Sequence, residues 1–226
     1  MATKSVLDTD QARVWMGEFG REYTDRNNQT PAELDYFYQE NYGITRRKLN
    51  EDFLREVPTD ARILEVGCNM GTQLLMLQEM GYSNLHGIEI QSYALERAKA
   101  RLPRAELIQA SALSIPHPDG YFDVVFTSGV LIHIAPSDLS RVMAEVHRCS
   151  NAWIWGFEYY SPKAAEIPYR GHAQLLWKTD FAKHYCEQFA DVELVKEERL
   201  HYRNDHNVDS MFLLRRHKDR REARCH

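Results

Sequence analysis

Cysteines, long apolar runs and an excess of one charge are all missing or scarce in this sequence. Four cysteines are scattered through 226 residues without a C-x-x-C pair, and no secretory leader is evident. This usage predicts free thiols in a reducing, cytoplasmic setting and argues against a disulfide-stapled secreted domain. No apolar run approaches the length of a membrane span, so we expect no membrane partner.

The charge balance argues against nucleic acid as a partner. The formal net charge is −5, and 27% of the residues are charged, which is ordinary for a globular protein. A basic stretch ends the sequence, and residues 218–226 are expected to form a flexible, solvated tail. We therefore expect a small-molecule partner and no nucleic acid, while the sequence leaves a monomer and a homodimer both open.

A glycine turn follows the first predicted strand. The apolar run at residues 63–66 predicts a buried strand, and a helical pattern starts at Thr72. The turn between them has the form E-x-G-x-x-x-G, with Glu65, Gly67 and Gly71 at the fixed positions. Dinucleotide folds use G-x-G-x-x-G and phosphate loops use G-x-x-x-x-G-K-[ST], and neither pattern occurs in the chain. A strand, tight turn and helix in this order predict a ligand site at the turn, because glycine lets a ligand approach the backbone.

Apolar strands alternate with helical patterns along the rest of the chain. Further strands are expected at residues 85–90, 106–109, 123–126, 152–157, 193–199 and 210–215. This order predicts an α/β fold, a Rossmann-like doubly wound and mostly parallel seven-stranded sheet with an antiparallel C-terminal edge strand. We assign residues 51–217 to this domain and expect a helix over residues 173–189.

Residues 1–50 are predicted to form a helical segment that covers the active site. Thr9 and Asp10 favour a helix that continues to Phe19. A second helix start is indicated by Thr30 as N-cap with Pro31 at the first helical position. Between the two helices, the polar residues 23–28 predict a turn that is rich in groups able to bind a small molecule.

Two polar features invite a functional interpretation. Glu89 ends the second predicted strand, where a carboxylate in such a fold binds ribose hydroxyls. His201, Asp205 and His206 have an irregular spacing in a polar loop, which favours solvent exposure, so we expect no metal.

The motifs together resemble class I S-adenosylmethionine-dependent methyltransferases. The glycine turn, the segment Gly87-Ile-Glu89-Ile and residues 122–133 have the order and spacing of that class, over roughly residues 50–160. More narrowly, residues 23–27, 155–160 and 169–178 resemble the pseudaminic acid biosynthesis-associated methylases. The resemblance implies S-adenosylmethionine as cofactor and S-adenosylhomocysteine as product.

The resemblance also implies a set of cofactor-binding residues. The glycine turn would meet the methionine part, Glu89 the ribose and Ile90 the adenine. The family commonly has an acid where this chain has Ser111, so that contact to the adenine is weaker or goes through water. The full set is Tyr23, Arg26, Glu65, Gly67, Cys68, Asn69, Gly71, Glu89, Ile90, Ser111, Ala112, Ser128, Gly129 and Val130, with Asn27 beside Arg26.

The acceptor is expected at the carboxyl ends of the fourth and fifth strands and the segments after them. A hydroxyl acceptor needs a base and an amine must arrive deprotonated, which makes Glu158, His133 and Tyr159 candidate catalytic residues. The alternative to a catalytic role for His133 is a structural one, in which it stabilises the loop after the fourth strand. Candidate substrate-binding residues are Tyr160, Tyr169, Arg170, His172 and Trp177.

Three interpretations of the function stay open. The first is methyl transfer to oxygen or nitrogen of a small polar acceptor, such as a nonulosonic-acid-type sugar or its precursor. The second is N-methylation of a free amino acid or guanidino compound, because Glu158 and its neighbouring tyrosines suit a cation. The third is a regulatory protein that binds S-adenosylmethionine without turnover.

Overall fold

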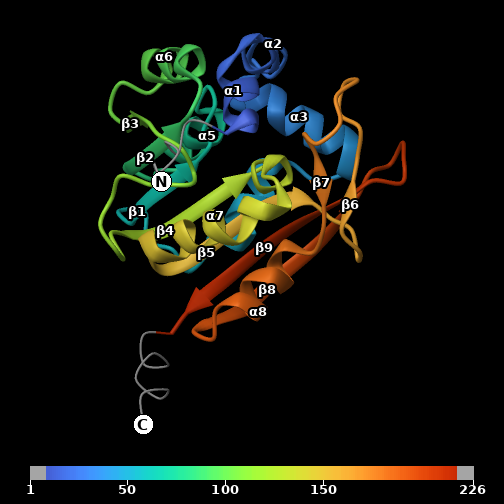
Figure 1. Cartoon of the computed structure of the whole chain (residues 1–226). Coiled ribbons are helices and arrows are strands. Elements are labelled where there is room, and N and C mark those ends of the chain that lie inside the picture. Colours follow the sequence, from blue (N-terminus) through green and yellow to red (C-terminus); the bar gives the residue numbers. More distant parts are fainter. Residues whose placement is uncertain (1–8, 218–226) are drawn as a thin grey trace, which may run out of the picture.

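The computed structural model describes residues 9–217, which form one seven-stranded sheet flanked by helices (Figure 1). The strand order is β3-β2-β1-β4-β5-β9-β8. The first five of these strands run parallel, whereas β9 is antiparallel to β5 and β8 is antiparallel to β9. The strands are β1 (Arg62–Val66), β2 (Asn84–Glu89), β3 (Glu106–Gln109), β4 (Phe122–Ser128), β5 (Ser150–Tyr159), β8 (Val192–His201) and β9 (Val208–Arg216). The predicted Rossmann-like α/β fold is confirmed.

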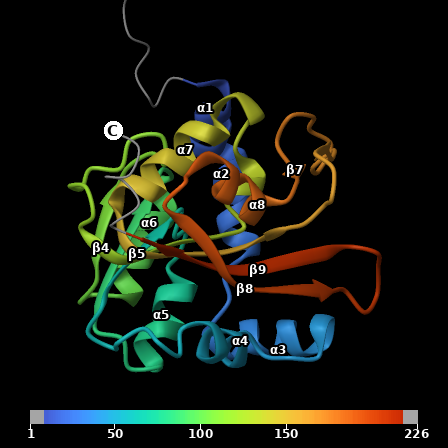
Figure 2. The same cartoon turned by 90° about the horizontal axis from the view of Figure 1, so that it is seen from below.

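Helices cover both faces of this sheet because both faces are apolar. One core holds side chains from α3, α4, α5 and α6, and the other holds side chains from α7 and α8. Figure 2, seen along the sheet, places α4 and α5 on one side and α7 and α8 on the other. These helices are α3 (Pro31–Tyr42), α4 (Arg46–Phe53), α5 (Thr72–Glu79), α6 (Ser92–Arg101), α7 (Pro136–Cys149) and α8 (Phe181–Gln188).

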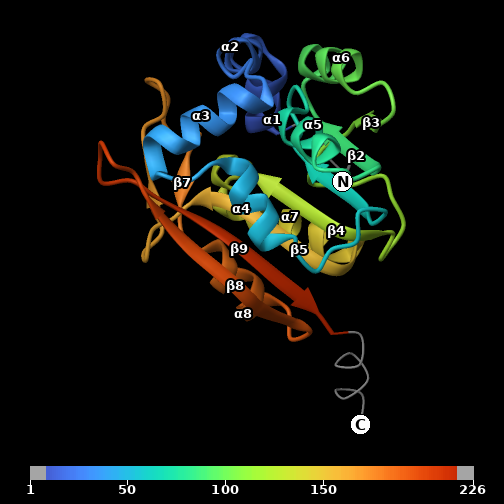
Figure 3. The same cartoon turned by 180° about the vertical axis from the view of Figure 1, so that it is seen from behind.

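The chain order reverses between β1 and β4, which lie side by side at the centre of the sheet. In open α/β sheets a ligand binds at the carboxyl ends of the strands at such a switch point. The short helices α1 (Asp10–Met16) and α2 (Glu18–Arg26) lie at this end, near α6 (Figures 1 and 3).

The N-terminal helices differ from the prediction in one respect. The expected helix through Phe19 breaks at Gly17, and Tyr23 to Arg26 belong to α2 instead of a polar turn. The break has a tertiary cause, because the carbonyl groups of Trp15 and Gly17 accept hydrogen bonds from the Gln91 side chain. The second helix start is as predicted: Thr30 caps α3 in a capping box with Glu33.

The helix expected over residues 173–189 is wrong in its first half. Residues Trp177–Lys178 form β7, which pairs with β6 (Ala165–Glu166), and α8 begins only at Phe181. Gln174 has a positive φ of 59°, which a helix cannot contain, and the Asp180 side chain caps α8. Among the described helices, none is long and apolar enough to cross a membrane. The predicted tail at residues 218–226 lies outside the described residues.

Candidate active site

The glycine turn after β1 is held tightly against two neighbouring strands. Gly67, Asn69 and Gly71 all have positive φ angles, 73°, 46° and 71°. The backbone N–H groups of Gly67 and Cys68 donate to the Ile88 carbonyl at 2.8 and 3.0 Å. A Cβ added to Gly67 would lie 2.7 Å from a methyl group of Val130, so only glycine fits at this point. The turn therefore presents bare backbone at the switch point.

Glu89 links the end of β2 to this turn. Its carboxylate accepts from the backbone N–H groups of Asn69 and Gln91, each at 2.8 Å. The side chain is buried, and burial raises the pKa of Glu89 above its ordinary value while the backbone donors oppose the rise. Each bond uses a different carboxylate oxygen, so each oxygen keeps a lone pair for a hydroxyl donor.

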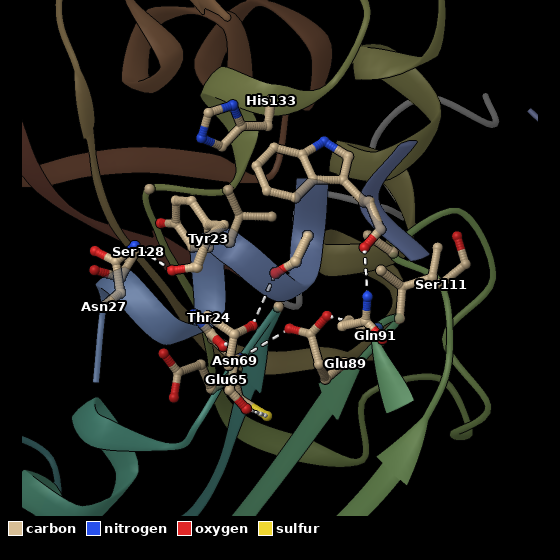
Figure 4. A pocket seen from close by; sticks show the side chains of 18 of the residues that line it. Tyr23, Thr24, Asn27, Glu65, Asn69, Glu89, Gln91, Ser111, Ser128 and His133 are labelled. Atoms are coloured by element: carbon tan, nitrogen blue, oxygen red, sulfur yellow. Dashed lines mark hydrogen bonds between the residues drawn. The ribbon is translucent and has the colours of Figure 1, made fainter. Parts of the chain in front are cut away.

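A first cavity of about 250 Å³ lies over the turn (Figure 4). Most of the cofactor-binding residues predicted from the sequence line it: Tyr23, Asn27, Glu65, Gly67, Cys68, Asn69, Glu89, Ile90, Ser111, Ala112, Ser128, Gly129 and Val130. These residues come from α2 and its C-cap, the end of β1 and the turn after it, the ends of β2 and β4, and the segments after β3 and β4. The structure thus brings together side chains that are far apart in the sequence.

Arg26 and Gly71 are the two predicted cofactor residues that do not line this cavity. The guanidinium of Arg26 pairs with Glu22 on the same helix at 3.4 Å. Gly71 is the N-cap of α5, and a Cβ there would lie 2.5 Å from the Leu102 side chain. Gly71 therefore serves the close packing of α5 rather than direct contact with a ligand.

Helices α1 and α2 supply lining residues that sequence reasoning missed, among them Gln11, Trp15 and Thr24. The Thr24 hydroxyl donates to the Asn69 side chain at 3.0 Å, and the Gln11 amide donates to the His133 carbonyl at 2.7 Å. No local pattern identifies these residues, because their partners lie far away in the sequence. The contacts hold the two helices across the cavity.

A second cavity of about 270 Å³ adjoins the first, and Tyr23, Gln73, Ser128, Gly129 and His133 line both. Of the acceptor residues predicted from the sequence, Glu158, His133, Tyr159 and Tyr169 line this second cavity. Sequence reasoning missed its other polar members, Tyr38, Tyr42, Tyr202 and Asp209. Asp209 offered one signal, a lone acid at the start of an otherwise apolar strand.

Glu158 is buried at the end of β5 and holds the loop after β4. Its two carboxylate oxygens accept from the backbone N–H groups of Val130 at 3.2 Å and Ile132 at 3.3 Å. Burial raises the pKa of Glu158 to about 7, against the lowering effect of these donors and of Thr127. The group therefore exchanges its proton near neutral pH.

His133 is buried and neutral. Its Nδ1 lies 2.7 Å from the Leu175 carbonyl oxygen, which assigns the ring proton to Nδ1 and leaves Nε2 as an acceptor. Burial lowers the pKa of His133 to about 4. Its ring packs against Trp15, with 4.6 Å between centroids, so the bracing role and a role as base both remain compatible with its position.

The remaining predicted acceptor residues lie outside both cavities. The Arg199 guanidinium lies 3.2 Å from the centre of the Tyr160 ring. Arg170 and His172 are exposed on the segment between β6 and β7, and Trp177 lies in β7 itself. Within residues 9–217, no group of three His, Cys, Asp or Glu side chains is placed to hold a metal ion.

Residues 63–152 match the methyltransferase domain family. The matched segment runs from β1 to the start of β5 and covers less than half of the chain. An uncharacterized methyltransferase from Synechocystis is 32% identical over 87 residues, which are 38% of this chain and 41% of the relative. The 24-methylenesterol C-methyltransferase 2 of Arabidopsis thaliana is 30% identical over 101 residues, 42% of this chain and 27% of the relative. The chain thus spans less than half the length of these curated relatives.

Solved structures show the same fold over most of the chain. The 1,6-didemethyltoxoflavin-N1-methyltransferase of Burkholderia thailandensis, solved with S-adenosylhomocysteine, has a TM-score of 0.70 at 12% identity, covering 96% of this chain and 93% of its own. The PH0226 protein of Pyrococcus horikoshii has a TM-score of 0.65 at 16% identity, covering 89% of this chain and 99% of its own. These likenesses show the Rossmann-like α/β fold that the chain shares with them, while the narrower resemblance to pseudaminic acid-associated methylases stays a prediction.

Proposed function

We propose that this protein transfers a methyl group from S-adenosylmethionine to oxygen or nitrogen of a small polar acceptor. The observation that carries the proposal is the character of the first cavity. Its described lining includes the acids Glu65, Glu89 and Asp138 but neither lysine nor arginine. A cavity of this kind suits an adenosyl ligand with a cationic sulfonium and disfavours cofactors that carry phosphate groups.

The lining residues fit such a ligand group by group. The lone pairs of Glu89 accept the ribose hydroxyls, and the bare backbone at Gly67 gives room for the sulfonium chain. Ile90 and Leu113 offer apolar surface to an adenine ring, and the Ala112 backbone supplies a donor beside it. When bound, S-adenosylmethionine supplies an electrophilic methyl group, and its transfer leaves a neutral thioether.

The junction of the two cavities supports transfer between a donor and an acceptor. Tyr23, Ser128 and His133 line both cavities, so a molecule in the second cavity meets one in the first there. The half-buried ring of Tyr23 packs edge-on against Trp15 and His133, which limits the access of water to the junction. Alignment and water exclusion supply much of the catalysis in such a displacement.

We propose His133, Glu158 and Tyr159 as the groups that handle the acceptor and its proton. The neutral His133 presents Nε2 as a hydrogen-bond acceptor that can orient a hydroxyl acceptor, and its lowered pKa makes it a weak base. Glu158 holds the loop of Ser128 and Val130, so it is also a positioning residue. Tyr159 lines the second cavity and can donate a hydrogen bond to the acceptor.

Two acceptor classes follow from the proposal. The narrower resemblance supports a nonulosonic-acid-type sugar or its precursor, methylated at a hydroxyl. The acids and tyrosines of the second cavity support an amine, such as a free amino acid or guanidino compound. A cytoplasmic setting is part of the proposal, because Cys68, Cys149 and Cys186 are free thiols.

The deciding experiment is calorimetric titration with S-adenosylhomocysteine, followed by an assay of its release from S-adenosylmethionine over a panel of sugars, amino acids and guanidino compounds. We expect Glu89→Ala to weaken binding by at least about tenfold, because a buried charge-assisted contact is lost. Glu96→Ala, which removes an exposed acid from α6, is the matched control. Tight binding without turnover on any acceptor would favour the regulatory alternative, and an unaffected Glu89→Ala variant would contradict the cofactor site.

A further inference from the structure

The charged side chains that line the second cavity are all acidic, and aromatic rings form most of the remaining wall. We propose that it binds a cationic nitrogen group, an ammonium or a guanidinium, between the carboxylate of Asp209 and the surrounding tyrosine rings. The inference rests on the proposed function, because it names the acceptor class for the same site: a molecule that carries a cationic nitrogen group. The nitrogen held at Asp209 has no lone pair, so the methyl group goes to a neutral oxygen or nitrogen elsewhere in the same molecule. This class is favoured over the acidic sugar.

The charge of the lining is the first observation. Glu158 and Asp209 both line the second cavity, and no lysine or arginine lines it within the described part of the chain. The carboxylate of a nonulosonic acid would lie beside these two acids without a cation to neutralise it. A like charge in a site of low dielectric is strongly unfavourable, so the lining selects against an anionic acceptor.

Asp209 is the second observation. It lies on β9 opposite Tyr159 of β5 and is only 1% exposed. The Tyr42 hydroxyl donates to its Oδ2 and the Tyr202 hydroxyl interacts with the same carboxylate, whereas Oδ1 is buried with no hydrogen-bond partner. A buried carboxylate oxygen without a partner is costly, and the positive charge of a bound nitrogen group would stabilise it.

The aromatic wall is the third observation. Six of the twelve tyrosines in the sequence line this cavity: Tyr23, Tyr38, Tyr42, Tyr159, Tyr169 and Tyr202. Phe37 and Phe157 complete the aromatic wall. The faces of such rings attract cations, and a cluster of rings beside an acid is a common way to bind an alkylated ammonium.

The cations of the protein itself lie just behind this wall and bond to other side chains, although Nη2 of Arg46 is buried without a hydrogen-bond partner. The Lys178 ammonium lies 4.7 Å from the centre of the Tyr159 ring and bonds to the Asn207 side chain. The Arg46 guanidinium donates to the Tyr38 hydroxyl at 2.7 Å and to Asn50 at 2.9 Å. Both charges lower the pKa of Asp209, but burial outweighs them and raises it to about 7. A cationic ligand would add to this stabilisation of the charged carboxylate.

The test uses choline and its neutral isostere 3,3-dimethylbutan-1-ol, titrated by calorimetry into the protein saturated with S-adenosylhomocysteine. We expect choline to bind at least about tenfold more tightly, because only choline has the charge that Asp209 and the rings attract. N-acetylneuraminate, a nonulosonic acid, serves as the anionic probe. Equal affinity for choline and the isostere, or tighter binding of N-acetylneuraminate, overturns the inference.

Two variants locate the binding in this cavity. Asp209→Asn should remove most of the preference for choline, whereas Asp60→Asn, which removes an exposed charge before β1, should leave it unchanged. Because Asp209→Asn removes a buried charge and can disturb folding, Tyr159→Leu and Tyr159→Phe provide a second pair. The leucine variant should lose preference for choline and the phenylalanine variant should retain it, since only the ring face is needed.

The outcome separates this inference from the proposed function. Binding of S-adenosylhomocysteine that depends on Glu89, without any preference for choline, removes only the cationic acceptor. Failure of S-adenosylhomocysteine to bind the wild-type protein removes the proposed methyl transfer, whatever the result with choline. A preference for choline that survives in both Asp209→Asn and Tyr159→Leu also overturns the inference, because the binding then lies elsewhere.

Discussion

Four buried carboxyl groups, Glu65, Glu89, Glu158 and Asp209, gather at one end of the sheet. Burial raises the pKa of all four, so each carries a proton more readily than an exposed acid does. Such groups are uncommon because burying a charge is costly. Glu65 and Glu89 line the first cavity and Glu158 and Asp209 line the second, so their concentration at this end of the sheet supports a ligand site there.

Glu158 provides a prediction that needs no ligand. Its pKa of about 7 in the folded protein lies above the ordinary value of 4.5, so the folded state binds the proton more tightly than the unfolded chain. The resulting stabilisation is complete below pH 4.5 and is lost as the pH rises through about 7. The free energy of unfolding of the wild type, relative to Glu158→Gln, should fall over this range by on the order of 2–3 kcal/mol.

Urea unfolding at several pH values measures this difference. Glu96→Gln serves as the control, because that exposed acid on α6 should give a difference from wild type that does not change with pH. A difference between wild type and Glu158→Gln that stays constant from pH 4.5 to 8 would contradict the raised pKa.

Helices α1 and α2 depend on tertiary contacts more than on their own sequences. They are 7 and 9 residues long, too short to be stable alone. The Gln91 side chain donates to the Trp15 and Gly17 carbonyl groups at 3.0 and 3.1 Å, and the Thr24 hydroxyl bonds to Asn69. These contacts place the two helices over the first cavity, where they limit the access of water.

The joint between these helices is closely packed at Gly20. A Cβ there would lie 1.8 Å from the Trp15 carbonyl oxygen, so Gly20→Ala must displace α1. We expect faster hydrogen exchange over residues 10–26 and binding of S-adenosylhomocysteine weakened by about tenfold, while the sheet keeps its protection. Glu22→Ala changes an exposed residue of the same helix and is the control. Unchanged hydrogen exchange in Gly20→Ala would contradict the role of this close packing in holding the two helices over the first cavity.

The molecule as a unit should respond to its ligand in thermal unfolding. A ligand that binds only the folded state stabilises it by about 2.7 kcal/mol at a hundredfold excess over Kd, which raises Tm by about 5–10 °C for a domain of this size. S-adenosylhomocysteine should therefore raise Tm. NAD+ should not, because no lysine or arginine within residues 9–217 lines the first cavity. A larger shift with NAD+ would contradict the proposed cofactor.

Local sequence patterns predicted much of this fold. The alternation of apolar strands and helices was enough for the sheet, and the positive φ angles at Gly67 and Gly71 follow from the glycine turn itself. The capping box at Thr30 was also readable, because all its partners lie within one turn of helix. These features share a cause: the interactions that decide them join residues close together in the sequence.

The tertiary structure alone decided the break at Gly17 and the composition of the second cavity. In both cases the deciding contact joins distant segments. Gln91 bonds to Trp15, and Tyr42 bonds to Asp209 across 167 positions of the chain. A pattern of neighbouring residues carries no information about such partners. The sequence therefore determined the glycine turn at the switch point of the sheet, and the packing of β9 and the N-terminal helices decided which side chains surround the two cavities beside it.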